Sequence, residues 1–252
     1  MTDLTLLFYT ANTIKDDCAV KIRNTLLKLT GGSIPIVSVS QKPIDFGENI
    51  CVGQIGQSAY NCYKQIFIAA QHAKTKYVAC VEDDAIYNME HFNHRPSSNR
   101  VFSYNNNLWL VERTMYWHRV GDGRLGSGMC CCIVATDMML AVLGKRFEKW
   151  PTEPLPPADT PLDKWEHCKK RIQANFQEPG RFDRNLGTRS VPVEYFKTDL
   201  PIVVLNRWGS LGGRRPNNKS DQIRVTSMDH LGKSSDIWGY YMEGKDAISV
   251  HI

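Results

Sequence analysis

The sequence predicts an α/β fold in which crossover helices connect the strands of a mostly parallel sheet. Three short apolar runs, at residues 4–9, 34–39 and 77–81, have the length and continuity of strands that are buried on both faces. Amphipathic stretches with apolar residues at helical spacing separate these runs. This alternation of strand and helix is typical of a parallel sheet, because consecutive parallel strands need a crossover connection.

Each early element of this pattern has a recognisable end. The run at residues 4–9 leads into Thr10, Ala11 and Asn12, as a buried strand does where it enters a loop. The first helix is predicted from apolar residues at helical spacing, which are Ala19, Ile22, Leu26 and Leu29. Gly31 and Gly32 are expected to end this helix. The second is predicted from a similar set after a glycine-containing loop: Gly53, Gly56, Tyr60, Tyr63, Ile66, Phe67 and Ala70.

Beyond residue 100 the alternation weakens. Three more strands are predicted, at residues 101–111, 129–134 and 201–205. Two more helices are predicted, at residues 136–143 and 164–176. Between the two helices, residues 150–163 hold five of the 12 prolines of the chain, which predicts an irregular connection. The C-terminal part of the fold is therefore expected to be irregular.

Length and composition bound the class of protein. A chain of 252 residues fits one large domain, and 42% hydrophobic and 23% charged residues are ordinary for a globular protein. No run approaches the roughly 18 apolar residues that cross a bilayer, and the N-terminal run is too short for a signal peptide. We expect a soluble, cytoplasmic protein without a membrane span.

The eight cysteines predict neither a disulfide framework nor a zinc site. Cys130, Cys131 and Cys132 are consecutive, the others lie in apolar stretches, and no C-x-x-C pair occurs. We expect reduced thiols that pack as small hydrophobic side chains. The net charge of +5 suits a polyanionic partner or a nucleotide diphosphate, although many enzymes with neutral substrates carry as much charge.

Polar residues follow all three early strands. Ligands of parallel sheets bind at the carboxyl ends of the strands, so residues 10–12, 38–40 and 82–84 are expected to converge. Glu82 and Asp84 are two residues apart at a strand end, where alternate side chains can share one cation. Mg²⁺ and Mn²⁺ prefer such oxygen ligands and complete their shells with substrate phosphates. A solvated acidic turn is the alternative, but three carboxylates behind an apolar strand are costly without a cation.

With these residues in view, the sequence resembles the GT-A nucleotide-sugar glycosyltransferases, and more closely a small family-2-like group found in bacterial and phage genomes. The motifs match in order and spacing over most of the chain: F-Y-T-A-N at 8–12, P-I-V-S-V-S-Q-K-P-I at 35–44, V-E-D-D-A-I-Y at 81–87, V-F-S-Y-N-N-N-L-W at 101–109, E-P-G at 178–180 and I-W-G at 237–239. The resemblance implies a GT-A-like, Rossmann-type mixed sheet with flanking helices. Residues 1–110 would form the nucleotide-sugar-binding half of the domain, and residues 111–252 its acceptor-binding and C-terminal half.

The resemblance also implies roles for individual residues. Nucleotide contacts would come from Thr10, Asn12, Ser38 and Ser40, and contacts to the metal and the diphosphate from Glu82, Asp83 and Asp84. The metal would be Mn²⁺ or Mg²⁺, and the donor a nucleotide sugar such as a UDP-sugar. Asn107 and Trp109 would shape the sugar or acceptor pocket, although core packing is the simpler explanation for an aromatic residue taken alone.

The metal shell in this reading lacks a third ligand. Similar sequences tend to carry a histidine in the loop after the last strand, where this chain has Trp208. His230, in the next segment, is the candidate substitute. A lone histidine is more often a packing or surface residue than a ligand, so both readings of His230 stay open.

An inverting transfer also needs a base and contacts to phosphate. The base must be a carboxylate within hydrogen-bonding reach of the acceptor hydroxyl, and Glu178 and Glu166 are the candidates, although either could have a structural role. Arg207 and Arg214 lie in a Gly- and Arg-rich loop, where guanidinium groups would suit the donor diphosphate or an acceptor backbone. A solvated basic loop is the alternative.

The acceptor is the least constrained part of the prediction. Some phage enzymes of this broad kind modify hydroxymethylated pyrimidines in DNA, and a mildly basic chain rich in arginine and aromatic residues fits a DNA acceptor. The same features fit a transferase that acts on a cell-surface glycan or a small molecule. A metal-dependent nuclease or phosphotransferase would use the same carboxylates, but no D…E-x-K pattern follows them.

Overall fold

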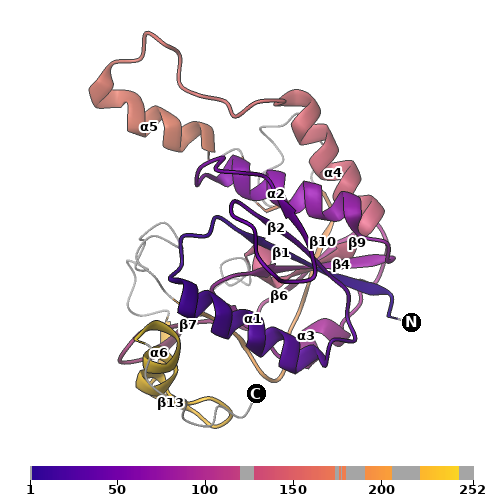
Figure 1. The fold of residues 1–252 in the computed structure, drawn as a ribbon, viewed down its shortest axis with the longest axis vertical. Helices are drawn as coiled ribbons and strands as arrows, with labels where there is room; N and C mark the ends of the chain where they lie inside the picture. The colour runs from indigo at the N-terminus through magenta and orange to yellow at the C-terminus, as the bar shows by residue number, and fades with distance from the viewer. Residues whose placement is uncertain are drawn as a thin grey trace.

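A seven-stranded sheet forms the centre of the fold (Figure 1). The computed structural model describes residues 2–119, 128–173, 176, 178–179, 191–205 and 222–243. Four strands run parallel on one side of the sheet: β4 (Tyr77–Glu82), β1 (Leu4–Thr10), β2 (Ile36–Ser40) and β3 (Glu48–Cys51). The other side holds β9 (Cys132–Ala135), which is antiparallel to its neighbours, then β6 (Phe102–Asn105) and β10 (Val193–Phe196), which pair in parallel. The predicted α/β fold with a mostly parallel sheet is confirmed.

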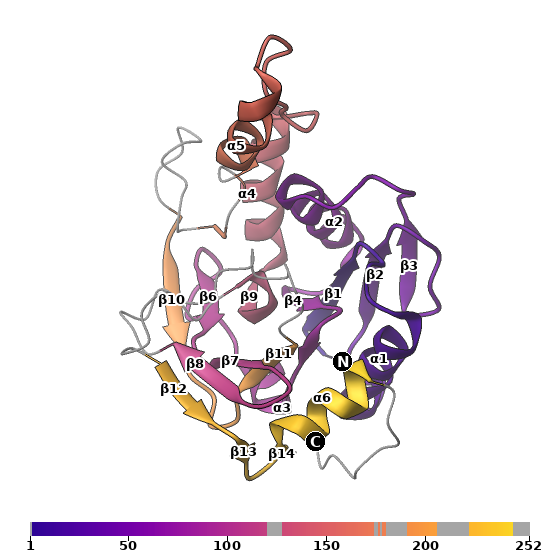
Figure 2. The ribbon, with the colours of Figure 1, turned by 90° about the vertical axis from the view of Figure 1, so that its left-hand side faces the viewer.

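Helices cover both faces of this sheet (Figures 1 and 2). One face packs against α2 (Ala59–His72) and α4 (Thr136–Lys149), and the other against α1 (Asp16–Thr30). The two faces are defined by the alternation of side chains along β1, where Leu7 joins the cluster that contains Ile66 of α2, and Phe8 joins the cluster that contains Leu26 of α1. Burial on both faces explains why these strands appear in the sequence as continuous apolar runs.

The two early helices begin and end where the sequence predicts. The α1 helix ends at Gly31, which has a left-handed backbone with φ of 56°. The α2 helix begins after Ser58, whose hydroxyl accepts a hydrogen bond of 3.1 Å from the backbone N–H of Asn61.

A second sheet packs beside the first (Figure 2). It has five strands in the order β12 (Gln222–Val225), β8 (Tyr116–Arg119), β7 (Leu108–Val111), β11 (Ile202–Leu205) and β5 (Ala85–Ile86). The remaining elements are α3 (Met89–Asn93), the 3₁₀ turn η1 (Met129–Cys131), α5 (Leu162–Gln173), the β13 (Ser227–Met228) and β14 (Gly232–Lys233) pair, and α6 (Ser234–Met242). The α6 helix packs on α1 in the cluster that contains Cys18 and Tyr241.

Two strands cross together from the first sheet to the second. The parallel pair β6 and β10 continues as the parallel pair β7 and β11. At the crossing, the N–H of Asn106 donates to the carbonyl of Phe196, and the N–H of Ile202 donates to the carbonyl of Asn107, both at 2.9 Å. The side-chain amides of Asn105 and Asn107 donate to the hydroxyl and the carbonyl of Thr198, both at 2.8 Å. Side chains therefore continue the pairing where the sheets separate.

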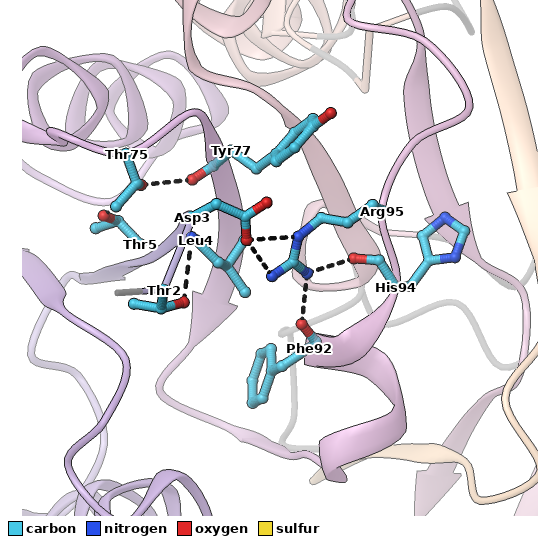
Figure 3. Close-up of polar contacts among 9 residues, drawn as sticks. All are labelled: Thr2, Asp3, Leu4, Thr5, Thr75, Tyr77, Phe92, His94 and Arg95. Atoms are coloured by element: carbon cyan, nitrogen blue, oxygen red, sulfur yellow. Dashed lines mark hydrogen bonds and ion pairs between the residues drawn. The ribbon is translucent and has the colours of Figure 1, made fainter.

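Arg95 joins the residue before β1 to the end of α3 (Figure 3). Its guanidinium donates to Oδ1 of Asp3 at 2.6 and 2.9 Å, and to the carbonyls of Phe92 and His94 at 2.7 and 2.6 Å. The hydrogen bond from Arg95 lowers the pKa of the Asp3 carboxyl. This contact lies at the end of β1 opposite to Thr10, so the two ends of the strand carry different polar groups.

Several later predictions were only partly correct. Residues 101–111 do not form one strand, because Asn105 and Asn107 turn their amides to Thr198 and divide the run into β6 and β7. The run at 129–134 begins as η1, and the strand starts at Cys132. The helix predicted at 136–143 continues to Lys149. Three other predictions are confirmed within a few residues: the strand at 201–205, the helix at 164–176 and the irregular connection before that helix.

None of the eight cysteines forms a disulfide bond, and five of them are buried: Cys18, Cys80, Cys130, Cys131 and Cys132. These five pack in the apolar clusters, as predicted. Within the described ranges, no helix has both the length and the apolar character needed to cross a membrane. The division at residue 110 stays a prediction.

Candidate active site at the strand ends

The carboxyl ends of β1, β2 and β4 lie next to one another, which places the predicted polar residues side by side. In the parallel register, Tyr9 is paired with Glu82, and Thr10 is paired with Ser40. The acidic turn at Asp83 and Asp84 follows β4 directly and is held against the second sheet, where the N–H of Leu205 donates to the carbonyl of Asp84 at 2.8 Å. The candidate site is therefore built where the two sheets meet.

Glu82 is held by two tyrosines. The hydroxyl of Tyr9 donates to Oε1 of Glu82 at 2.6 Å, and the backbone N–H of Glu82 donates to the hydroxyl of Tyr87 at 3.0 Å. Burial raises the pKa of Glu82 to about 8, and the negative charges of Asp84, Asp83 and Glu178 act in the same direction, whereas the hydrogen bond from Tyr9 lowers it. A carboxyl with this pKa binds a proton at neutral pH unless a cation takes the place of the proton.

Asp83 is fixed by the end of β1. The hydroxyl of Thr10 donates to Oδ2 of Asp83 in a short hydrogen bond, and it accepts one of 2.8 Å from the backbone N–H of Asn12. Gln65 of α2 donates to the carbonyls of Thr10 and Val39, at 2.8 and 3.2 Å. One helix thus holds the ends of two strands at fixed positions relative to Asp83.

Asn12 joins the loops after β1 and β2. Its backbone is left-handed, with φ of 53°, a conformation that asparagine tolerates better than most residues. Its Oδ1 accepts hydrogen bonds from the backbone N–H groups of Gln41 and Lys42, at 2.8 and 2.9 Å. The side chain of Gln41 then bonds both the N–H and the carbonyl of Gly56, at 3.1 and 2.8 Å. Three loops at the strand ends are therefore connected to each other.

Ser38 and Ser40 lie at the predicted strand end, but their hydroxyls serve the neighbouring strand. Both residues are fully buried. Ser38 donates to the carbonyl of Phe46 at 2.7 Å, and the amide of Asn49 donates to Ser38 at 2.9 Å and to Ser40 at 3.0 Å. The structure brings these two serines to β3 rather than to the carboxylates.

The two candidate bases occupy very different places. Glu178 is partly buried, and its charge contributes to the raised pKa of both Glu82 and the Cys62 thiol, after the larger effect of burial. Glu166 is exposed on α5, a helix that extends away from the central sheet (Figure 2). The charge of Glu178 therefore acts on Glu82, whereas Glu166 is not among the charges that shift the pKa of Glu82.

His230 is not brought to this group. Burial lowers its pKa, and the carboxylates that oppose this effect belong to Asp229 and Glu90. In the part of the chain that the structure describes, no three His, Cys, Asp or Glu side chains gather in a group that could hold a metal ion. Arg207 and Arg214, predicted to contact phosphate, lie outside the described residues.

The residues at the strand ends fit a cation that is shared with a substrate. Mg²⁺ and Mn²⁺ bind through one or two protein carboxylates and fill the rest of the shell with phosphate oxygens and water, so a closed set of three protein ligands is not required. The charges of Asp84, Asp83 and Glu178 all raise the pKa of Glu82, so negative charge is concentrated at this point. A divalent cation would compensate that charge, and Glu82 and Asp84 are the residues that would hold it.

Sequence reasoning missed several residues of the site. Tyr9 and Cys62 were hidden in apolar patterns, and nothing in the sequence indicated that Tyr9 is adjacent to Glu82 across two strands. Gln41 and Gln65 are buried amides that bond loop and strand carbonyls. Gln65 is the one of these residues that the sequence could have indicated, because it is a polar amide on the apolar face of a predicted helix.

No family model matches the chain, and no curated protein matches it. Among solved structures, the chain is similar to a glycosyltransferase involved in the glycosylation of the major capsid of PBCV-1, with 11% identity and a TM-score of 0.46 over 81% of this chain and 92% of that one. It is also similar to S. aureus TarS 1-349 in complex with UDP-GlcNAc, with 11% identity and a TM-score of 0.41 over 82% of this chain and 59% of that one.

A third similar structure is a putative glucose-1-phosphate thymidylyltransferase from Bacillus anthracis, with 8% identity and a TM-score of 0.40 over 79% of this chain and 88% of that one. Because all three TM-scores are below 0.5, these similarities carry no argument about activity.

Proposed function

We propose that the chain is a glycosyltransferase that moves a sugar from a nucleotide-sugar donor to a hydroxyl group of an acceptor. One observation carries the proposal. Glu82, Asp83 and Asp84 lie together at the carboxyl end of β4, where the charges of Asp84, Asp83 and Glu178 all raise the pKa of Glu82. A site of this kind suits a divalent cation together with the diphosphate of a nucleotide sugar.

In the proposed arrangement, the nucleotide lies beside Thr10 and Asn12, and Glu82 and Asp84 hold Mn²⁺ or Mg²⁺ at the diphosphate. The cation, when bound, supplies charge neutralisation for the departing diphosphate. Ser38 and Ser40 act indirectly, by holding β3 and its loop beside the nucleotide. Arg207 and Arg214 are proposed to contact the donor diphosphate.

We propose Glu178 as the base of a single, inverting displacement. Its carboxylate accepts the proton of the acceptor hydroxyl as the acceptor oxygen forms a bond to the anomeric carbon of the sugar. The bond between that carbon and the diphosphate oxygen breaks, and its electron pair leaves with the diphosphate. Glu178 is preferred to Glu166 because its charge acts on Glu82, whereas Glu166 is exposed on α5.

The double variant Glu82→Ala, Asp84→Ala tests the metal and the donor together. We expect it to stay folded and to lose Mn²⁺-dependent turnover of the donor by at least about a hundredfold, because second-shell residues alone alter metal sites by 10–100-fold. The donor is first identified by thermal shift with UDP-, GDP-, TDP- and CDP-sugars, with and without Mn²⁺. Glu166→Gln is the matched carboxylate control and should keep full turnover. Equal turnover in the double variant and the wild type would contradict the proposal.

For the acceptor, we propose a hydroxymethylated pyrimidine in DNA, which would place the reaction in the cytoplasm, or in the host cytoplasm if the chain is encoded by a phage. The net charge of +5 supports a polyanionic acceptor. Duplexes with and without 5-hydroxymethylcytosine are incubated with the donor, and a mass gain of one sugar on the modified duplex alone is expected. A gain on a glycan acceptor instead would indicate the cell-surface alternative, and nicking of plasmid DNA with Mg²⁺ would indicate a nuclease.

A further inference from the structure

Two hydroxyls of β1 reach the strand-end carboxylates: that of Thr10 donates to Asp83, and that of Tyr9 donates to Glu82. Tyr9 is 5% exposed, and its ring packs in the cluster that contains Tyr63 and Ile66 of α2. The hydroxyl lies 2.6 Å from Oε1 of Glu82, a distance typical of the strong hydrogen bonds between a hydroxyl and a carboxylate. A ring that is fixed by packing and ends in such a bond has little freedom to release its partner.

The sheet register explains why this bond forms. Tyr9 and Glu82 are paired residues of the parallel strands β1 and β4, so their side chains leave the sheet on the same face. Tyr87, from the segment after β5, accepts the backbone N–H of Glu82 at 3.0 Å. The main chain and the carboxylate of Glu82 are therefore fixed by two different tyrosines.

The two oxygens of Glu82 differ in their surroundings. Oε1 accepts the bond from Tyr9, whereas none of the described residues donates a hydrogen bond to Oε2. A carboxylate that is anchored through one oxygen presents the other in a fixed direction. Residues that orient a metal ligand in this way control metal affinity without touching the ion.

We propose that Tyr9 is a positioning residue that anchors Oε1 of Glu82 and so directs Oε2 toward the divalent cation. This inference rests on the proposed function, because it assumes that Glu82 is a metal ligand. It assigns a role to the β1 tyrosine that the apolar pattern of the strand conceals.

The test is Tyr9→Phe, which removes the hydroxyl and keeps the ring. Mn²⁺ affinity is measured by electron paramagnetic resonance of free Mn²⁺, with and without UDP. We expect the dissociation constant to rise about tenfold, the lower end of the effect of losing a residue that orients a metal ligand. The matched control is Tyr60→Phe, because Tyr60 lies in the same apolar cluster and donates to the carbonyls of Trp150 and Pro151. Its Mn²⁺ affinity should equal that of the wild type.

A double-mutant cycle separates positioning from a general effect on the fold. In the Glu82→Ala background, Tyr9→Phe should change Mn²⁺ affinity no further, because the group it orients is gone. Unchanged Mn²⁺ affinity in Tyr9→Phe, or an equal loss in the presence and the absence of the Glu82 side chain, would overturn the inference alone. A wild-type protein that binds neither Mn²⁺ nor a nucleotide would instead overturn the proposed function.

Discussion

Two groups of strands form sheets in different ways: β1, β2 and β4 before residue 90, and β6, β7, β10, β11 and β12 after residue 100. Strands β1, β2 and β4 have five to seven residues, and nearly all of these are buried. Strands β6, β7, β10, β11 and β12 have four residues each and range from fully buried to exposed. The first group is covered by helices on both faces, whereas the second group is divided between two sheets and includes the sheet edges β10 and β12.

This difference shows what a single sequence reports reliably. A strand that is buried on both faces must be apolar along its whole length, so its pattern is visible without knowledge of its neighbours. A short strand at an edge or at a crossing depends on pairing with a distant segment, as β10 does with β6. Stability should follow the same division, since removal of a buried side chain costs more than removal of an exposed one.

Leu7→Ala in β1 should cost about 2–5 kcal/mol in the free energy of unfolding, because the side chain is fully buried and its removal leaves a cavity. The matched variant, Ile223→Ala in β12, should change stability by less than about 0.5 kcal/mol, since that side chain is 49% exposed. Denaturant unfolding measures both. Equal losses at the two positions would show that both groups of strands contribute alike.

His91 lies between the two groups along the chain, and it should make the fold sensitive to acid. Its side chain is fully buried, its ring stacks with Phe196 of β10, and neither ring nitrogen has a hydrogen-bond partner among the described residues. Burial, and to a smaller extent His94, lowers the pKa of His91 to about 3. Below pH 6.5 the unfolded chain binds a proton that the folded chain excludes until about pH 3, so stability falls as the pH falls through this window.

The contribution of His91 is at most about 1.4 kcal/mol per pH unit, the value for one proton. His91→Phe should reduce the slope of unfolding free energy against pH between 6 and 4. The control is His72→Gln, at a side chain that is 45% exposed, and its slope should resemble that of the wild type. An unaltered slope in His91→Phe would mean that other groups cause the acid sensitivity.

The smallest effect concerns the start of α2. Ser58→Ala removes the hydroxyl that accepts from the N–H of Asn61, and it should cost about 1 kcal/mol in thermal or denaturant unfolding. Ser58→Asn should retain most of the stability, because asparagine is also a good helix cap. A loss in Ser58→Asn as large as that in Ser58→Ala would argue against the capping role.

The candidate site, like the fold, has one part that the sequence predicts and another part that depends on the pairing of distant segments. The position of Glu82, Asp83 and Asp84 at the end of a buried strand could be predicted, because the apolar run before them is visible in the sequence. The bond from Tyr9 to Glu82 joins residues 73 positions apart, and it depends on the register of two strands. Ser38 and Ser40 were placed at the right strand end, but their use by Asn49 depends on β3, which the sequence did not reveal.

The doubled crossing at Asn105, Asn107 and Thr198 has a consequence for motion. Two backbone and two side-chain hydrogen bonds tie the strand pairs at the level where one sheet ends and the other begins. Separation of the two strand pairs at this level would break all four bonds together. The two strand pairs are therefore expected to move together where they pass from one sheet to the other.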